Sequence, residues 1–163
     1  MTRRLCLFLI LGFALSLPLA VLAQQQEHPM AAPAKANFDK AILQQVWDGW
    51  CTLDPANVAK YYGKEKTHVF YDITPLQYHG WADYEAGVKP VLAQWKSAKC
   101  KVNYDGQIRE ESPTMAWSAS TVDMDVVTKE GKAQKMTVRW TAIWHRHGSN
   151  WMIAHDHTSA PLQ

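Results

Sequence analysis

Over residues 38–50, apolar residues recur every three to four positions, which is the period of an α-helix. The apolar residues at this spacing are Phe38, Ile42, Leu43, Val46, Trp47 and Trp50. The spacing predicts an amphipathic helix of about fourteen residues, with Asn37 as its N-cap and its end near Cys51.

Two shorter elements are predicted next. Asp54 and Pro55 favour the start of a second helix, because aspartate caps free amides and proline suits the first helical position. This short helix should end at Gly63, after three residues that face inward: Val58, Tyr61 and Tyr62. The β-branched and aromatic run 67–73 predicts a strand, and the segment 75–80 predicts a loop or a short second strand.

The rest of the pattern completes an α+β fold class. Helical spacing returns over 81–96, where Pro90 should kink the helix and the apolar face consists of Tyr84, Val88, Val91, Leu92 and Trp95. Alternation then predicts antiparallel strands at 100–108, 115–128, 133–147 and 150–158. The order predicts three helices in the N-terminal half that cover a curved antiparallel sheet.

Four of the seven histidines lie on the last two predicted strands: His145, His147, His155 and His157. An even-numbered loop at Gly148-Ser149 places Trp144 opposite Ile153. Because side chains alternate between faces, His155 and His157 should share the apolar inner face, while His145, His147 and Asp156 lie on the other. This parity argues against a four-histidine metal cluster. A histidine on the inner face is either satisfied by a partner in the core or serves as an acid–base group in a pocket.

Residues 1–23 have the pattern of a secretory signal peptide. Arg3 and Arg4 precede an apolar run, and small residues lead to a cleavage point after Ala23. The run is shorter than a membrane span requires and its end is cleavable, so no membrane association is expected after its removal. The polar segment 24–36 predicts a disordered leader, and 37–163 predicts one folded domain. The protein is therefore expected to be secreted or periplasmic.

Composition narrows the range of partners. The chain has 17 basic and 15 acidic residues, and the predicted cleavage removes two arginines and no acid. A neutral chain has no net field that attracts phosphate, so nucleic acid is not an expected partner. Cys51 and Cys100 either form a disulfide or remain as two buried thiols. There is no glycine-rich phosphate loop and no cofactor is predicted, whereas the eight tryptophans suit both a core and an apolar pocket.

Three features together resemble a known family. A predicted strand ends in Val69-Phe-Tyr-Asp72, a glycine at Gly80 precedes the third helix, and the chain closes with Trp-x-Ile-x-His-x-His-x-Ser-x-Pro over 151–161. These features resemble the SnoaL-like branch of the nuclear transport factor 2-like superfamily, which includes ketosteroid isomerase, over roughly 37–162. The resemblance implies a cone-shaped fold with an apolar pocket at its open end, and a homodimer through the outer face of the sheet. It does not imply one reaction, because members of one fold differ in chemistry.

The resemblance transfers only one catalytic position. In ketosteroid isomerase the general base is an aspartate at the end of the first long strand, and Asp72 lies close to that place. The tyrosine and the protonated aspartate that stabilise the oxyanion there have no clear equivalents, since the first helix here carries Trp47 and Trp50 and no tyrosine. Ketosteroid isomerase activity is therefore not predicted by name. Asp72 either faces the pocket together with His68 or caps the turn that follows its strand.

Two functions of different class follow from these observations. The first is a secreted module that binds a small apolar molecule in its pocket, without established catalysis. The second is a cofactor-independent lyase or isomerase that uses Asp72 or His157 as a base, with His155 beside it. The predicted pocket residues are Trp47, Tyr62, His68, Trp81, Trp95 and Trp140. A metal site made of His68, His155 and His157 is a third alternative, and no metal is assigned.

Overall fold

The computed structural model describes residues 38–161 and contains two α-helices and seven strands. The helices are α1 (Ala41–Trp50) and α2 (Gly80–Leu92), and two 3-10 turns, η1 (Pro55–Asn57) and η2 (Ala59–Tyr61), lie between them. The strands are β1 (Val69–Tyr71), β2 (Tyr78–His79), β3 (Trp95–Val102), β4 (Gln107–Ser112), β5 (Met115–Thr128), β6 (Ala133–His147) and β7 (Asn150–Ser159). The predicted signal peptide and most of the predicted leader lie outside the described residues.

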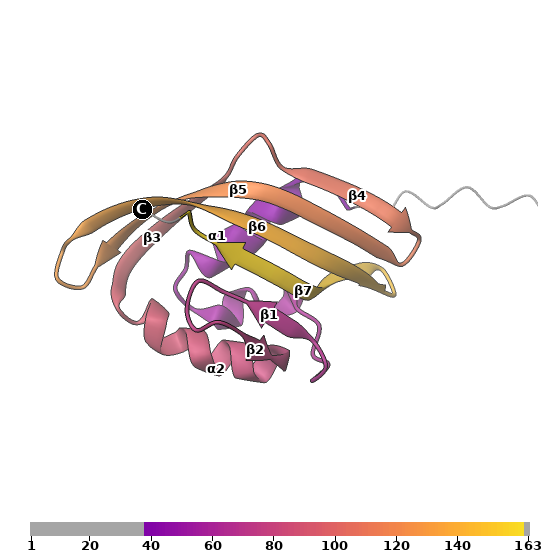
Figure 1. Ribbon diagram of the computed structural model, residues 1–163, viewed down its shortest axis with the longest axis horizontal. Coiled ribbons are helices and arrows are strands. Elements are labelled where there is room, and N and C mark those ends of the chain that lie inside the picture. The colour runs from indigo at the N-terminus through magenta and orange to yellow at the C-terminus, as the bar shows by residue number, and fades with distance from the viewer. Residues whose placement is uncertain (1–37, 162–163) are drawn as a thin grey trace, which may run out of the picture. The chain divides into compact units, whose positions relative to one another are not determined.

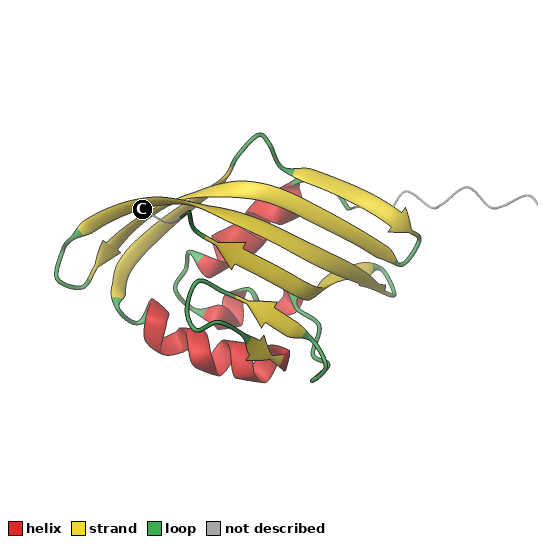
Figure 2. Cartoon of the chain, viewed as in Figure 1, coloured by secondary structure: helices red, strands yellow, loops and turns green. Residues whose placement is uncertain are grey.

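All seven strands belong to one curved sheet. Their order is β2-β1-β7-β6-β5-β3, and β4 pairs with β5 beyond this path. Figure 1 shows β5 and β6 arching over α1, with α2 beside the short strands β1 and β2. The helices therefore cover the concave face of the sheet, as the α+β prediction requires (Figure 2). One difference is that β1 pairs with β7 in parallel, so the sheet is mixed rather than wholly antiparallel.

The core lies between α1 and the inner face of the long strands. Leu43, Val46 and Trp47 of α1 are buried at the predicted spacing. The Trp47 ring meets the Trp140 ring of β6 edge to face, with 5.9 Å between centroids. Aromatic rings in this arrangement add attraction beyond the area they bury. The first predicted helix is therefore confirmed from Ala41 onward, whereas its predicted N-cap at Asn37 lies outside the described residues.

The second predicted helix is replaced by the two 3-10 turns. Asp54 does cap this segment, because its Oδ1 accepts a hydrogen bond from Ala56 N over 3.0 Å. The segment must then bring Tyr62 to the sheet, where Tyr62 forms a parallel bridge with Ile153. A 3-10 turn rises about 2.0 Å per residue, more than the α-helix, and so covers this distance with fewer residues.

Other boundaries differ because strand pairing overrides helical spacing. The third predicted helix ends at Leu92, and Trp95 already pairs with Thr128 at the start of β3. Pro90 lies inside α2, as predicted. The predicted strand 100–108 consists of the end of β3 and the start of β4, and the predicted strand 67–73 is shortened to β1.

A β-bulge changes the faces of the last strand. The turn at Gly148-Ser149 has the predicted length, and Trp144 pairs with Ile153 as predicted. The next pair is Ile143 with His155, so Ala154 is one extra residue in β7. Beyond Ala154 the alternation is reversed, and Asp156 is buried on the inner face instead.

The predicted inner position of His155 and His157 is therefore wrong. His157 is exposed and His155 is half-buried on the outer face. The parity argument that separated these two histidines from His145 and His147 fails for the same reason, because all four lie on the outer face.

Cys51 and Cys100 form a disulfide, which settles the alternative that their spacing left open. The bond joins the C-terminal end of α1 to β3, and the two Cα atoms are 6.0 Å apart, a usual separation for a disulfide. In the part of the chain that the structure describes, neither α-helix is long and apolar enough to cross a membrane.

Candidate functional site

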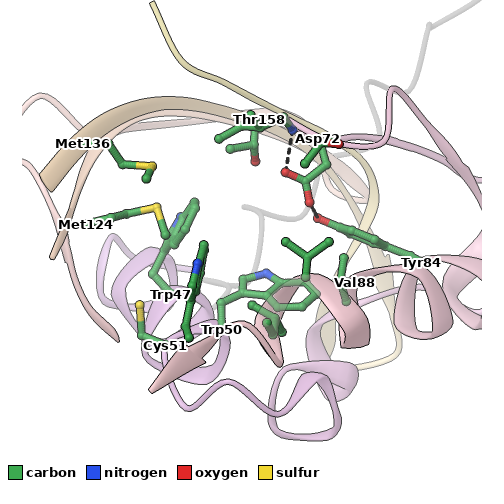
Figure 3. A pocket seen from close by; sticks show the side chains of 14 residues that line it. Trp47, Trp50, Cys51, Asp72, Tyr84, Val88, Met124, Met136 and Thr158 are labelled. Carbon is green, nitrogen blue, oxygen red and sulfur yellow. Dashed lines mark hydrogen bonds between the residues drawn. The ribbon is translucent and has the colours of Figure 1, made fainter. Parts of the chain in front are cut away.

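An apolar cavity of about 140 Å³ lies between the two helices and the inner face of the sheet (Figure 3). Its walls come from α1, α2 and five strands or their ends: Trp47, Trp50, Cys51, Asp72, Ile73, Thr74, Tyr84, Val88, Val91, Leu92, Trp95, Met124, Met136 and Thr158. Ile73 and Thr74 are exposed as well as lining the cavity, so it opens to solvent beside the segment that follows β1.

Asp72 is the one carboxylic acid among the described residues that line this cavity. It follows β1 directly, and its carboxyl group points toward Tyr84 and Thr158 (Figure 3). The Tyr84 hydroxyl donates to Asp72 Oδ2 over 3.3 Å, and the Ile73 backbone N–H donates to Oδ1 over 2.7 Å. Asp72 therefore faces the cavity, without the predicted neighbour His68, and it also bonds the backbone of the following turn, so each interpretation from the sequence holds in part.

Burial raises the pKa of Asp72, although its two hydrogen-bond donors act in the opposite direction. Burial also raises the pKa of Tyr84 well above its usual value, and the nearby carboxylates of Asp156 and Asp72 raise it further. Tyr84 therefore keeps its proton and is the donor in the bond to Asp72. A carboxyl group held this way in an apolar wall can accept a hydrogen bond when ionised or donate one when protonated.

A second carboxyl group, Asp156, lies buried behind the cavity wall. Its Oδ2 accepts from the Tyr62 hydroxyl over 2.7 Å and from Trp140 Nε1 over 3.2 Å, while Oδ1 has no partner. Burial raises the pKa of Asp156 to about 7, and the charge of Asp72 acts in the same direction. Trp50, on the cavity wall, donates from Nε1 to the Tyr62 hydroxyl over 3.0 Å and so connects the cavity to this network.

The structure brings together only part of the predicted site. Asp72, Trp47 and Trp95 line the cavity. Tyr62, Trp81 and Trp140 are buried near it but do not line it: Tyr62 and Trp140 bond Asp156, and Trp81 packs on Tyr62 with 4.8 Å between ring centroids.

The predicted histidines are elsewhere. His68 Nε2 lies 3.4 Å from Glu65 Oε2 and does not line the cavity. His155 and His157 lie on the outer face, so the predicted grouping of His68, Asp72 and His157 does not form. Within 38–161, no group of three or more His, Cys, Asp or Glu residues could hold a metal ion, so the three-histidine alternative is also wrong.

Sequence reasoning missed Asp156 and the pairing of Tyr84 with Asp72. Tyr84 was expected to face inward from its helix, but its partner depended on where the short strand ended. The alternation of side chains predicts Asp156 on the outer face, and only the bulge at Ala154 turns it inward.

A family model described as a SnoaL-like domain matches residues 40–163. The chain belongs to the SnoaL-like family. A comparison of this SnoaL-like protein with curated proteins found no match.

Solved structures share its fold at low sequence identity. A nuclear transport factor 2-like superfamily protein from Salmonella enterica is 15% identical, with a TM-score of 0.65, and the match covers 76% of this chain and 91% of that one. A candidate scytalone dehydratase from Novosphingobium aromaticivorans is 13% identical, with a TM-score of 0.63 and coverage of 75% and 83%. A candidate dehydratase of the NTF2-like family from Streptomyces avermitilis is 11% identical, with a TM-score of 0.65 and coverage of 76% and 93%. Similarity at this level shows the NTF2-like fold, not a shared reaction.

Proposed function

We propose that this SnoaL-like protein binds a small, largely apolar molecule in the cavity and that Asp72 contacts the polar group of that molecule. The observation that carries the proposal is one carboxyl group in an otherwise mostly apolar wall. Sites for small molecules combine apolar walls with a few polar groups that fix orientation. Trp47, Trp50 and Trp95 offer flat surfaces to a ring.

The cavity volume limits the size of the ligand. A dry cavity of about 150 Å³ in another protein is known to accept benzene. The cavity here, of about 140 Å³, therefore suits a single six-membered ring, with any longer substituent directed to the opening beside Ile73. We expect a ring that carries one hydroxyl or carbonyl group, since either can hydrogen-bond the Asp72 carboxyl group.

Calorimetry and ligand-observed NMR with matched ring compounds test this proposal. Phenol and cyclohexanone should bind more tightly than toluene and methylcyclohexane. Asp72→Asn should weaken phenol binding by about tenfold, because a hydrogen bond to a charged group contributes about that much to affinity. Toluene binding should be unchanged. Val91→Trp should block the cavity, because Val91 is a half-buried wall residue of α2.

The matched control is Ala86→Trp, an exposed position on the same helix that does not line the cavity. If Val91→Trp and Ala86→Trp bound the ring compounds with equal affinity, the proposal would be contradicted. It would also be contradicted if no ring compound showed saturable binding.

A second candidate function is proton abstraction from a carbon next to a carbonyl, without a cofactor. The raised pKa of Asp72 favours it, since a stronger base is more effective at neutral pH, and dehydratase descriptions among the structural neighbours favour the same class. His157 has no part in this version, because it lies on the outer face. Cyclohexanone in D₂O should exchange its α protons faster with the protein than without it. Exchange that persists unchanged in Asp72→Asn would remove this candidate and leave the binding proposal intact.

We also propose that the protein is exported to the periplasm or the exterior of the cell after removal of residues 1–23. The Cys51–Cys100 disulfide supports it, because such bonds persist in oxidising compartments. Mass spectrometry of the mature protein should find Gln24 as the first residue. The predicted homodimer stays a prediction, to be measured by sedimentation.

A further inference from the structure

We propose that His155 and His157 form a binding site for a divalent late transition metal ion on the outer face of the sheet, with copper(II) bound more tightly than zinc(II). The site lies on the opposite face from the cavity and is independent of the proposed ligand.

The backbone of β7 places His155 and His157 on the same face of the sheet. The bulge at Ala154 turns both outward, and residues two apart on a strand share a face with about 6.6 Å between their Cα atoms. The neighbouring strand β1 runs parallel, with Val69 paired to His155 and Tyr71 paired to His157. Two imidazoles at this spacing can converge on one ion at about 2.0 Å from each nitrogen.

One hydrogen bond fixes which nitrogen of His155 is available. His155 Nδ1 lies 2.7 Å from the carbonyl oxygen of Val69. A carbonyl oxygen only accepts, so Nδ1 carries the proton and the neutral ring presents the lone pair of Nε2. Metal-binding histidines use this arrangement, in which a backbone carbonyl orients the ring and makes the other nitrogen a better ligand.

The ring of Tyr71 packs against both imidazoles and limits their movement. The ring centroid of Tyr71 lies 5.3 Å from that of the His155 ring and 5.8 Å from that of the His157 ring, at interplanar angles of 86° and 85°. Both imidazoles therefore stand perpendicular to the same phenol ring, which limits the rotamers that must be ordered on binding. In the single chain Tyr71 is 39% exposed and His157 is exposed, so an ion can reach the monomer from solvent and keep water as its remaining ligands.

The donor set decides which ion fits. No third His, Cys, Asp or Glu joins a metal-binding group among the described residues, so the protein supplies two nitrogens. For such a set, affinity rises toward copper(II) and is lower for zinc(II). A second His-x-His pair, His145 and His147 of β6, offers an internal comparison. Within residues 38–161, neither of these rings has a hydrogen bond to a backbone carbonyl like that of His155, and His147 Nε2 lies 4.0 Å from Glu65 Oε1.

The test is titration of the untagged, metal-free protein with copper(II) and with zinc(II) at pH 7.5, followed by calorimetry and electron paramagnetic resonance. We expect one equivalent of copper(II) with nitrogen ligands, and weaker zinc(II) binding at the same site. The double variant His155→Gln/His157→Gln should bind copper(II) at least about tenfold more weakly. The single variant His157→Gln should show the same direction of change, and its exposed position leaves folding unaffected.

The matched control is His145→Gln/His147→Gln, which should retain the affinity of the parent protein. Copper(II) binding that survives in the His155/His157 variants would overturn the proposal. Equal loss in both double variants, or zinc(II) binding as tight as copper(II), would overturn it as well.

Discussion

The Tyr62 hydroxyl donates to Asp156 Oδ2 over 2.7 Å in a part of the core where both side chains are almost completely buried. Burial raises the pKa of Tyr62 well above its usual value, so this hydroxyl keeps its proton and stays the donor. Trp140 supplies the second donor to the same oxygen. The core therefore holds a carboxyl group whose pKa is raised to about 7 and whose other oxygen has no partner.

This group predicts that stability falls between acid and neutral pH. The pKa of Asp156 rises from its ordinary 3.8 to about 7 on folding, so the folded state binds the proton more tightly. The stabilisation that protonated Asp156 gives to the folded state is fully present below about pH 3.8 and is lost as the pH rises through about 7. Between these two pH values, ionisation of Asp156 should lower the free energy of unfolding by about 1.4 kcal/mol per pH unit. Urea denaturation at a series of pH values measures it.

Asp156→Asn should remove most of this slope, because the amide keeps an acceptor for Tyr62 and Trp140 but does not ionise. At pH 8 the variant should be at least as stable as the parent protein. Asp123→Asn is the control, since Asp123 is exposed and its pKa is lowered by a hydrogen bond from Thr137. A slope that is unchanged in Asp156→Asn would contradict the assignment.

The parts of the fold that follow local patterns could be predicted from the sequence. Leu43, Val46 and Trp47 identify the inner face of α1, and the length of the Gly148-Ser149 turn gives the pairing of Trp144 with Ile153. In both cases short-range spacing decides the outcome. The cavity itself was expected, and Trp47, Trp95 and Asp72 do line it.

The remaining errors arise where a tertiary contact overrides the local pattern. Nothing in the residues around Ala154 marks an extra residue in the strand, yet that one residue decides whether His157 or Asp156 faces the core. In the same way, the helical spacing that ends at Trp95 does not reveal that Trp95 pairs with Thr128. A parity argument holds only as far as the first bulge.

Deletion of Ala154 should therefore be far more harmful than its small size suggests. Without the bulge, His155 and His157 would turn inward, and Asp156 and Thr158 would turn outward. The core would lose the partner of Tyr62 and gain two imidazoles, so we expect a loss of more than about 4 kcal/mol or no cooperative unfolding. Circular dichroism during urea denaturation measures this.

Ala154→Gly keeps the extra residue and should cost only about 1 kcal/mol. If the deletion variant unfolded at the same urea concentration as the parent, the bulge would not be what orients this strand.

The Cys51–Cys100 disulfide should contribute strongly to stability. It closes a segment with a sequence separation of 49 residues, and removing such a crosslink costs about 4 kcal/mol in the chain-entropy model. Cys51→Ser/Cys100→Ser should lower the guanidinium midpoint accordingly and should not respond to reductant. The parent protein should fall to the same midpoint when it is reduced. A double variant as stable as the oxidised parent would rule out this contribution.

Gly87→Ala should destabilise the protein although it lies inside α2. Alanine in a helix interior is normally about 1 kcal/mol better than glycine. Here a Cβ at position 87 would collide with the ring of Tyr78, which is buried and stacks on Tyr84 with 4.8 Å between centroids. Since Tyr84 donates to Asp72, movement of Tyr78 should weaken both folding and phenol binding.

Urea denaturation and calorimetry with phenol measure the two effects of Gly87→Ala, and we expect a stability loss of about 1–3 kcal/mol because overpacking of a filled core costs this much. Gly106→Ala is the control, because a Cβ there meets its neighbours at 3.4 Å or more. If Gly87→Ala instead gained the usual stability of an alanine in a helix, Tyr78 would be free to move. The Tyr84–Asp72 pair would then be less rigidly placed than its packing indicates, and phenol binding should be the same in both variants.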